Sequence, residues 1–167
     1  DGALVQVAIA DRDGQIVYSS LATEPPANGA PMRISIADRE HFRAHLDGAP
    51  PRLFISHPVF GRISQQWTVQ FSRPLRDSGE FCGVIVLSMS AHYLSAALRD
   101  IFPDSGDVAL VVRDDGAYLA RSQRLDQVLG SAVPPSRPFV VDPAARSGFY
   151  EARASIDETE RHYAWHR

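Results

Sequence analysis

Cysteine is nearly absent from this sequence: Cys82 is the single cysteine among 167 residues, which excludes a disulfide framework. Cys82 lies in a run with strand character, where we expect it to fill the core. Basic residues are outnumbered by acidic ones, 17 against 20, and this argues against a nucleic-acid-binding protein. No window has the ~18 apolar residues of a membrane span. The first residues lack the basic and apolar regions of a signal peptide.

Motifs for catalysis and metal binding are also missing. No Gly-x-Ser-x-Gly sequence and no motif that pairs a nucleophile with a base occurs, so we expect no enzyme activity in this segment. Asp11-Arg12-Asp13-Gly14 lacks the third oxygen ligand and distal glutamate of a calcium loop and predicts a hairpin turn. His41 and His45 have a spacing that can hold zinc, but Glu40 precedes the first histidine instead of following it. We interpret the pair as a solvated helix face and predict no catalytic residue, metal or cofactor.

The clearest structural signal is a β-hairpin over residues 67–89. Apolar and polar residues alternate from 67 to 72, as in a strand with two unlike faces. Pro74 lacks an amide hydrogen and is expected to end that strand, and Asp77-Ser78-Gly79 predicts the turn. Residues 83–87 are apolar on both faces, as in a central buried strand. The polar face of the first strand consists of Thr68, Gln70 and Ser72.

A helix is predicted before this hairpin. Ser35, followed by an acid three residues on, resembles a capping box and places the helix at about residues 36–46. Phe42 and Leu46 define its apolar face, and Arg39 lies on the same face. This arginine either extends to the rim of the sheet or points at a bound anion or carboxylate. Further strands are expected at residues 4–10, 15–19 and 52–56, and a second helix at 90–98.

Part of the chain repeats. Residues 110–122, LVVRDDGAYLARS, resemble residues 8–20, AIADRDGQIVYSS, at an offset of 102 positions. Each piece is an apolar strand, an acid–glycine turn and a second strand that ends in serine. The order of elements predicts two successive units, at residues 1–103 and 104–167. The second unit has a proline-rich loop at 130–146 and expected strands at 148–155 and 161–166, and it lacks a last strand.

Together these segments resemble a double Cache domain, the PAS-like sensor module of bacterial receptors. ADREHFRAH (37–45), LFISHPVFGRISQQWTVQFSRPL (53–75) and GEFCGVIVLSMSAHYL (79–94) are similar to its membrane-distal half. LARSQ (119–123) and GFYEARASIDETERHYAWHR (148–167) are similar to its membrane-proximal half. The resemblance implies an α+β fold of two tandem PAS-like units, each a central antiparallel β-sheet flanked by helices. The first unit would lack its N-terminal helix, and the second would be incomplete.

The resemblance also implies a cellular setting. Two transmembrane helices and a long N-terminal helix would lie outside these 167 residues. The domain would lie on the periplasmic side of the bacterial inner membrane and act as a homodimer. GRISQQWTVQFSRPL with GVIVLS is most similar to sensor regions of diguanylate cyclases, whose output is a GGDEF domain. Sensor histidine kinases carry very similar regions. A ligand-free dimerisation or spacer module is the alternative reading, and no nucleic acid is expected as a partner.

In this family the ligand lies in the distal half, between the sheet and a lid of helix and loop. The hairpin would be the floor here, and the helix 36–46 with the loop 57–64 would be the lid. Ser90 stands where amino-acid-binding relatives often place an aspartate, which argues against an amino-acid ligand. Relatives that bind dicarboxylates use cationic and hydroxyl groups, so a small polar or anionic ligand is expected. The candidate ligand-binding residues are Arg39, Phe42, His57, Arg62, Thr68, Gln70, Ser88 and Ser90.

Overall fold

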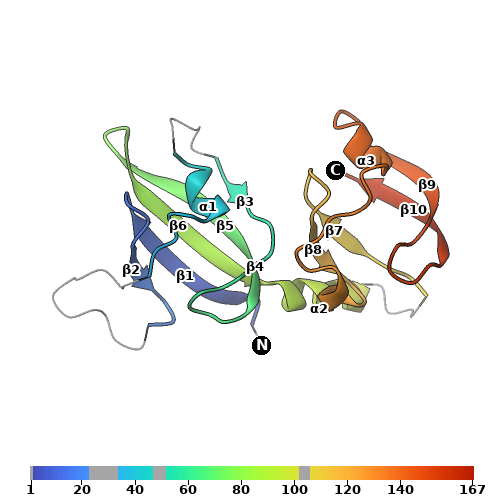
Figure 1. Ribbon diagram of the computed structural model, residues 1–167, viewed down its shortest axis with the longest axis horizontal. Coiled ribbons are helices and arrows are strands. Elements are labelled where there is room, and N and C mark those ends of the chain that lie inside the picture. The colour runs from blue at the N-terminus through green and yellow to red at the C-terminus, as the bar shows by residue number, and fades with distance from the viewer. Residues whose placement is uncertain (1, 23–33, 47–51, 102–105) are drawn as a thin grey trace.

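Two bodies joined by a single helix make up the molecule (Figure 1). The structure is a computed structural model that describes residues 2–22, 34–46, 52–101 and 106–167. The first body contains a six-stranded antiparallel sheet with the short helix α1, and the second contains two two-stranded sheets with the short helix α3. The expected α+β fold of two successive units is confirmed. The expected boundary between residues 103 and 104 lies outside the described residues.

The sheet of the first unit is built around β5 (Trp67–Asp77) and β6 (Glu80–Ser90), which form the predicted hairpin. The φ angles at its turn are positive, 50° at Ser78 and 90° at Gly79, a combination that matches the twist of the flanking strands. The strand order is β2-β1-β6-β5-β3, with β4 also beside β5. The remaining strands are β1 (Leu4–Asp11), β2 (Ile16–Ser19), β3 (Phe54–Ile55) and β4 (Val59–Phe60).

Strand β5 does not end at Pro74, contrary to the prediction. It continues to Asp77, and Pro74 lies opposite Val84 of β6. On the other side of β5, the short strand β3 pairs only with Phe71 and Ser72. Pro74 lies beyond that pairing, where β5 is an edge strand, so its missing amide hydrogen deprives no neighbouring strand of a donor.

The core of the first unit lies on one face of the sheet. Buried apolar side chains of β1 and β6 pack there against Ile36 and Phe42. The expectation that residues 83–87 are buried on both faces is wrong, because Ile85 and Leu87 of β6 are 38% and 36% exposed. Cys82 is half-buried at the start of the same strand and does not belong to the core. The sheet therefore has one covered face, and that face carries the candidate site.

The predicted helix at 36–46 is reduced to a single turn, α1 (Glu40–Arg43). The Ile36 amide donates to Gly14 O at 2.8 Å, and Ser35 forms a β-bridge to the same hairpin. These contacts keep the chain extended at residues 35 and 36, so a helix cannot begin there. The Ser35 hydroxyl accepts only from the amide two residues on, at 3.2 Å, and closes a local turn.

Helix α2 (Ala91–Ile101) follows β6 directly and leads into the second unit (Figure 1). The predicted helix at 90–98 is confirmed, and Ser90 Oγ accepts from the Tyr93 amide at 3.2 Å as a helix cap. Trp67 of β5 packs against the core of the second unit. That unit contains β7 (Leu110–Val112), β8 (Tyr118–Arg121), the 3-10 turn η2 (Leu125–Gln127), α3 (Pro138–Val141), β9 (Ser147–Arg153) and β10 (Glu160–His166).

The internal repeat expected from the sequence is present in the backbone. In the first hairpin the Gly14 amide donates to Asp11 O at 3.0 Å, and in the second the Gly116 amide donates to Arg113 O at 2.8 Å. Both glycines have positive φ, 77° and 87°, which glycine adopts without strain. The two turns are equivalent, and Arg113 takes the place that Asp11 has in the first.

Candidate functional site

A cavity lies between the covered face of the sheet and the segments that lie over it. Its volume is about 40 Å³. Strands β1, β2, β5 and β6 supply the floor, and segments 34–41 and 59–63, which we call the cover, supply the roof. The polar residues that line it are Gln6, Arg39, His41, Arg62, Gln70 and Ser88, and none of the described lining residues is acidic.

Hydrogen bonds between neighbouring side chains organise the polar part of the floor. Gln70 Nε2 donates to Thr68 Oγ1 at 2.7 Å, and Ser88 Oγ donates to Gln70 Oε1 at 2.6 Å. On the adjoining strands, Gln6 Nε2 donates to Ser19 Oγ at 2.9 Å. All five side chains are buried. Because each is bound to another, their amide and hydroxyl groups have fixed orientations.

His41 brings an unpartnered nitrogen to the cover. It is 5% exposed, and its Nδ1 has no hydrogen-bond partner within the described residues. Burial, together with the nearby charge of Arg39, lowers the pKa of His41 to about 4. The imidazole is therefore neutral at neutral pH, and it can exchange a hydrogen bond with a ligand.

The solvated helix face predicted for His41 and His45 is wrong. Both side chains are buried, and His45 Nε2 lies 2.9 Å from Ser72 Oγ. Ser72 Oγ donates its hydrogen to His41 O at 2.8 Å, so it accepts from His45 Nε2 and fixes the tautomer of that imidazole. The prediction was wrong because it placed both histidines on a long helix, whereas the chain folds back onto β5 after a single helical turn. In the described part of the chain, no three His, Cys, Asp or Glu side chains converge as metal ligands would.

Two arginines of the cover differ in their partners. Arg62 forms a bidentate pair with Asp38, at 2.9 and 2.7 Å, and also donates to Ser35 O. The hydrogen bond from Arg62 lowers the pKa of Asp38, so this pair is charged and self-contained. The Arg39 side chain makes no hydrogen bond or ion pair within the residues that the structure describes. Arg39 is thus the cavity cation that can accept an anionic group without first losing a partner.

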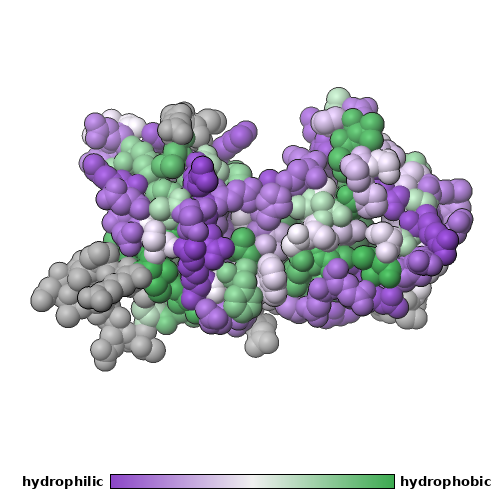
Figure 2. Space-filling view, viewed as in Figure 1, coloured by the Kyte–Doolittle hydropathy of each residue, from purple (hydrophilic) through white to green (hydrophobic). Residues whose placement is uncertain are grey.

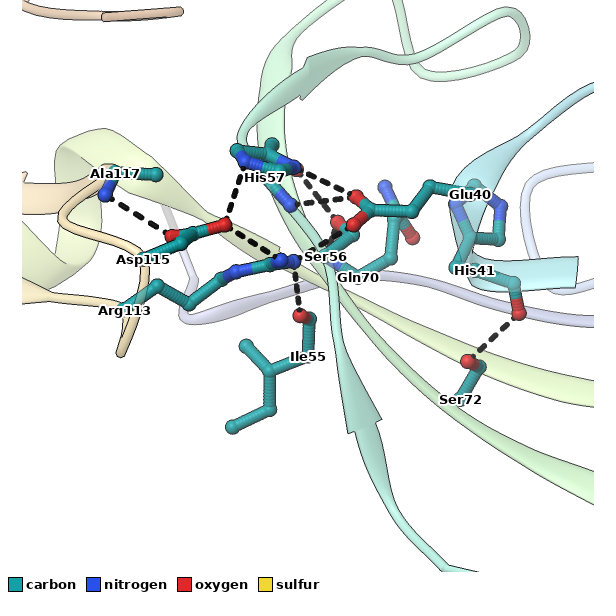
Figure 3. Close-up of polar contacts among 10 residues, drawn as sticks. All are labelled: Glu40, His41, Ile55, Ser56, His57, Gln70, Ser72, Arg113, Asp115 and Ala117. Carbon is teal, nitrogen blue, oxygen red and sulfur yellow. Dashed lines mark hydrogen bonds and ion pairs between the residues drawn. The ribbon is translucent and has the colours of Figure 1, made fainter. Parts of the chain in front are cut away.

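A polar cluster connects the two units beside α1 (Figure 3). Glu40 Oε2 accepts from the His57 amide and from His57 Nδ1, at 3.1 and 2.8 Å. Glu40 Oε1 accepts from Arg113 at 2.8 Å, and Arg113 also donates to Ile55 O and to Asp115, at 2.9 and 2.7 Å. His57 Nε2 completes the cluster 3.0 Å from Asp115 Oδ2. We call these residues the inter-unit cluster; Figure 2 shows a largely hydrophilic surface where the two bodies meet.

Both carboxylates of the inter-unit cluster are ionised at neutral pH. Burial by itself would raise the pKa of Glu40, but hydrogen bonds from His57 and Arg113 outweigh it and lower the pKa. Burial is likewise outweighed at Asp115, where the Ala117 amide and Arg113 lower the pKa. The His57 imidazole therefore faces an anion at each nitrogen, and it donates to both only when it carries two protons.

Four of the eight predicted ligand-binding residues line the cavity, namely Arg39, Arg62, Gln70 and Ser88. Gln6 and His41 also line the cavity. The sequence did not predict Gln6 as a ligand-binding residue, and it placed His41 on a solvated helix face. Gln6 is the one polar residue on the buried face of β1, which it shares with Ala8 and Ala10. Gln6 could have been found from the sequence, because it is a lone glutamine at the period-two positions that are otherwise occupied by small apolar residues.

The other four predicted residues lie elsewhere. Phe42 is in the core, with its ring edge-on to Phe81 at 5.8 Å between centroids. Thr68 is fully buried behind Gln70, and Ser90 caps α2. His57 belongs to the inter-unit cluster. Its position was not predictable, because one of its partners, Asp115, comes from a hairpin more than fifty residues away in the sequence.

This architecture is the fold of extracellular ligand-binding sensor domains, and the expected Cache-like sensor fold is confirmed. No protein-family model and no curated protein sequence matches the chain. Among solved structures, the extracellular domain of the putative histidine kinase rpHK1S-Z16 matches with a TM-score of 0.80 and 25% identity, over 97% of this chain and 64% of that one. The fold is thus that of a sensor segment and not of a catalytic domain.

Chemoreceptor domains have the same fold at lower identity. The ligand-binding domain of Pseudomonas fluorescens CtaA, in complex with L-alanine, has a TM-score of 0.62 at 15% identity, over 95% of this chain and 63% of that one. That of Pseudomonas aeruginosa PctC, in complex with GABA, has a TM-score of 0.61 at 19% identity, over 89% and 61%. The chain therefore spans less than two thirds of each of these three structures.

Proposed function

We propose that this chain is the ligand-sensing part of a receptor and that a small anionic molecule binds in the cavity of the first unit. The observation that carries this proposal is Arg39, a cavity cation without a partner in the described residues, beside the free Nδ1 of His41. An anion on Arg39 would gain charge-assisted hydrogen bonds, and Gln70 and Ser88 would orient its other end. The presence of a cavity with such a lining supports ligand binding over a ligand-free spacer.

The lining favours an anion without an amino group. CtaA and PctC are in complex with L-alanine and GABA, and both ligands carry an ammonium group. An ammonium group in a buried site needs a carboxylate or comparable acceptors, and among the residues that the structure describes none that lines this cavity is acidic. Hydroxy acids and short dicarboxylates have the complementary chemistry, namely carboxylate and hydroxyl groups without a cation.

Ligand entry would require the cover to move. The cavity volume of about 40 Å³ is enough for a few water molecules but small for a four-carbon acid. The cover rests on the floor chiefly through Ile34, Ile36 and Ile63, and apolar contacts of this kind can reform at a new spacing. A bound ligand would thus hold the cover, and the α1 turn next to it, in a second position.

For the receptor as a whole we propose a periplasmic domain on the bacterial inner membrane, tethered by flanking helices and acting as a homodimer. None of the helices in the described ranges is long and apolar enough to cross a membrane. The 25% identity to a histidine-kinase sensor domain exceeds the 12–19% to the chemoreceptors and favours a kinase output over a chemoreceptor output, with a diguanylate cyclase output as the alternative. Assays of autophosphorylation and of cyclic di-GMP synthesis by the full-length protein would distinguish a kinase output from a cyclase output.

The first prediction concerns Arg39. We expect a panel of hydroxy acids and dicarboxylates to contain a ligand that raises the melting temperature, and Arg39→Gln to abolish the rise. A ligand at 100 times its dissociation constant adds ~2.7 kcal/mol to the stability. For a chain of this size, that corresponds to a rise of about 5–10 °C in thermal denaturation.

Arg43→Gln is the matched control, because Arg43 is an exposed arginine on the same α1 turn and does not line the cavity. This variant should respond to the ligand as the wild type does. A panel in which amino acids stabilise the protein and acids without an amino group do not would refute the proposed ligand class. If an acid raises the melting temperature of Arg39→Gln as much as that of the wild type, Arg39 is not part of the binding site.

A further inference from the structure

A second cavity lies inside the second unit, between β8, β10 and the strand β9 with the turn that follows it. Its volume is about 20 Å³. Two arginines, Arg121 and Arg137, and three tyrosines, Tyr118, Tyr150 and Tyr163, are among its lining residues, and none of the lining residues in the described ranges is acidic. The described part of the cavity wall therefore carries two fixed positive charges and no negative one.

Arg121 is a buried cation without an anion. Its side chain is only 3% exposed, and it donates to the Gln123 carbonyl but forms no ion pair within the described residues. Asp157, whose negative charge attracts Arg121, is engaged by Arg161 in a bidentate pair at 2.6 and 2.8 Å. Burial lowers the pKa of Arg121, and the attraction of Asp157 does not compensate for it. A guanidinium nevertheless stays charged, so this position carries an uncompensated charge.

Arg137 faces the same cavity and is held by aromatic rings. Its guanidinium carbon lies 5.3 Å from the ring centroid of Tyr150 and 5.6 Å from that of Tyr163, and these two rings stack at 4.8 Å. Its single hydrogen bond within the described residues is a long one, 3.3 Å to Arg153 O. The rings position the guanidinium through cation–π attraction and leave most of its donors unused.

We propose that this second cavity binds a small carboxylate anion, with its oxygens between Arg121 and Arg137 and its apolar end against Val133. Planar guanidinium groups match a carboxylate in geometry, and the tyrosine hydroxyls add neutral donors. The volume of about 20 Å³ is enough for about one water molecule, so the lining side chains would have to move apart to admit even an acid of two or three carbons. The site is separate from that of the first unit and does not rest on the function proposed for it.

The test uses propionate as the probe, with sodium chloride at equal ionic strength as the reference. We expect propionate to raise the melting temperature in a saturable way beyond chloride, and calorimetric titration to give one site. Arg137→Gln should weaken that binding by at least about tenfold, the effect of losing one charge-assisted hydrogen bond. Arg146→Gln, at an exposed arginine of the same unit, should leave the binding unchanged.

A variant of the first cavity separates the two sites. Propionate binding should be the same in Arg39→Gln as in the wild type; if it is lost there and kept in Arg137→Gln, the anion belongs to the first unit and the proposal fails. The proposal also fails if propionate acts no differently from chloride, or if phosphate binds more tightly than propionate. Arg121→Met should abolish binding, and if circular dichroism shows that it does not fold, Arg137→Gln alone decides.

Discussion

Arg39 and His41 lie two residues apart on the cover of the first cavity, and burial gives them different chemistry. Arg39 is partly exposed and keeps its charge available. His41 is buried, and its low pKa keeps the imidazole neutral. A charged group and a neutral acceptor or donor at one rim can therefore bind two different parts of one ligand.

The low pKa of His41 predicts a loss of stability in mild acid. In the unfolded chain this histidine takes up a proton near pH 6.5, whereas in the folded protein it does so near pH 4. Between these values the unfolded state binds more protons, so stability falls as the pH falls through that window. The maximum loss is about 3 kcal/mol. Urea unfolding at pH 7 and at pH 4.5 should show a smaller difference for His41→Gln than for the wild type.

His162 supplies the control for this pH effect. Its side chain is 87% exposed, and His162→Gln should leave the pH dependence as it is in the wild type. His45 and the two carboxylates of the inter-unit cluster act in the same direction as His41, so some acid sensitivity should persist in His41→Gln. An unchanged pH dependence in His41→Gln would show that His41 is not neutral in the folded protein.

At the scale of elements, the close approach of β1 and β6 fixes the sheet under the cavity. At Gly83 a Cβ atom would lie 2.0 Å from Ala10 O, and the φ of Gly83 is 147°. Both the contact and the backbone angle exclude other residues without a shift of β1. Because Gln6, Ala8 and Val86 of these two strands line the cavity, such a shift would also change its floor.

Gly83→Ala should therefore destabilise the protein strongly. We expect a loss of about 3 kcal/mol from the clash and the strained backbone together. Urea denaturation should show a lower midpoint with an unchanged slope. Gly106→Ala is the control, since a Cβ there meets no atom within 4 Å and should change the midpoint little. Equal midpoints for the two variants would mean that β1 yields to the added methyl group without cost.

At the scale of the whole molecule, the inter-unit cluster connects the cover of the first cavity with the second unit. Glu40 lies between Arg39 and His41 in the sequence, and both of these line the cavity. Its carboxylate binds Arg113 of the second hairpin (Figure 3). A movement of the cover would therefore stretch or remake this contact, which would link the ligand binding that we propose directly to the second unit.

A double-mutant cycle should detect this link. Glu40→Gln and Arg113→Met, singly and together, should give a coupling energy of about 0.5–1 kcal/mol, modest because the side chains are partly exposed. Urea denaturation measures it, and added salt should reduce it. The same cycle on Arg153 and Glu158, an exposed pair with 64% and 77% exposure, should give a value near zero. If the effects of the Glu40 and Arg113 variants on stability are additive, this contact does not couple the two units.

Much of the fold could be predicted because local patterns dominate it. The hairpin at 67–89 has period-two alternation and a turn that requires positive φ, and both features act between near neighbours. The repeated acid–glycine turns are local in the same way. The prediction of a helix at 36–46 was wrong because Ser35 and Ile36 bind the first hairpin, about twenty residues earlier in the chain. A contact of that kind leaves no trace in helix periodicity.

The sequence by itself determined the order of strands and turns, the absence of a disulfide framework and the polar inward face of β5. These follow from residue types and spacings of two to four positions. The tertiary structure alone decided that His41 is buried and neutral, that His57 lies between Glu40 and Asp115, and that Arg121 forms no ion pair within the described residues. The reason is physical: burial and charge pairing depend on which distant segments meet, and a polar side chain acquires its chemistry from those neighbours.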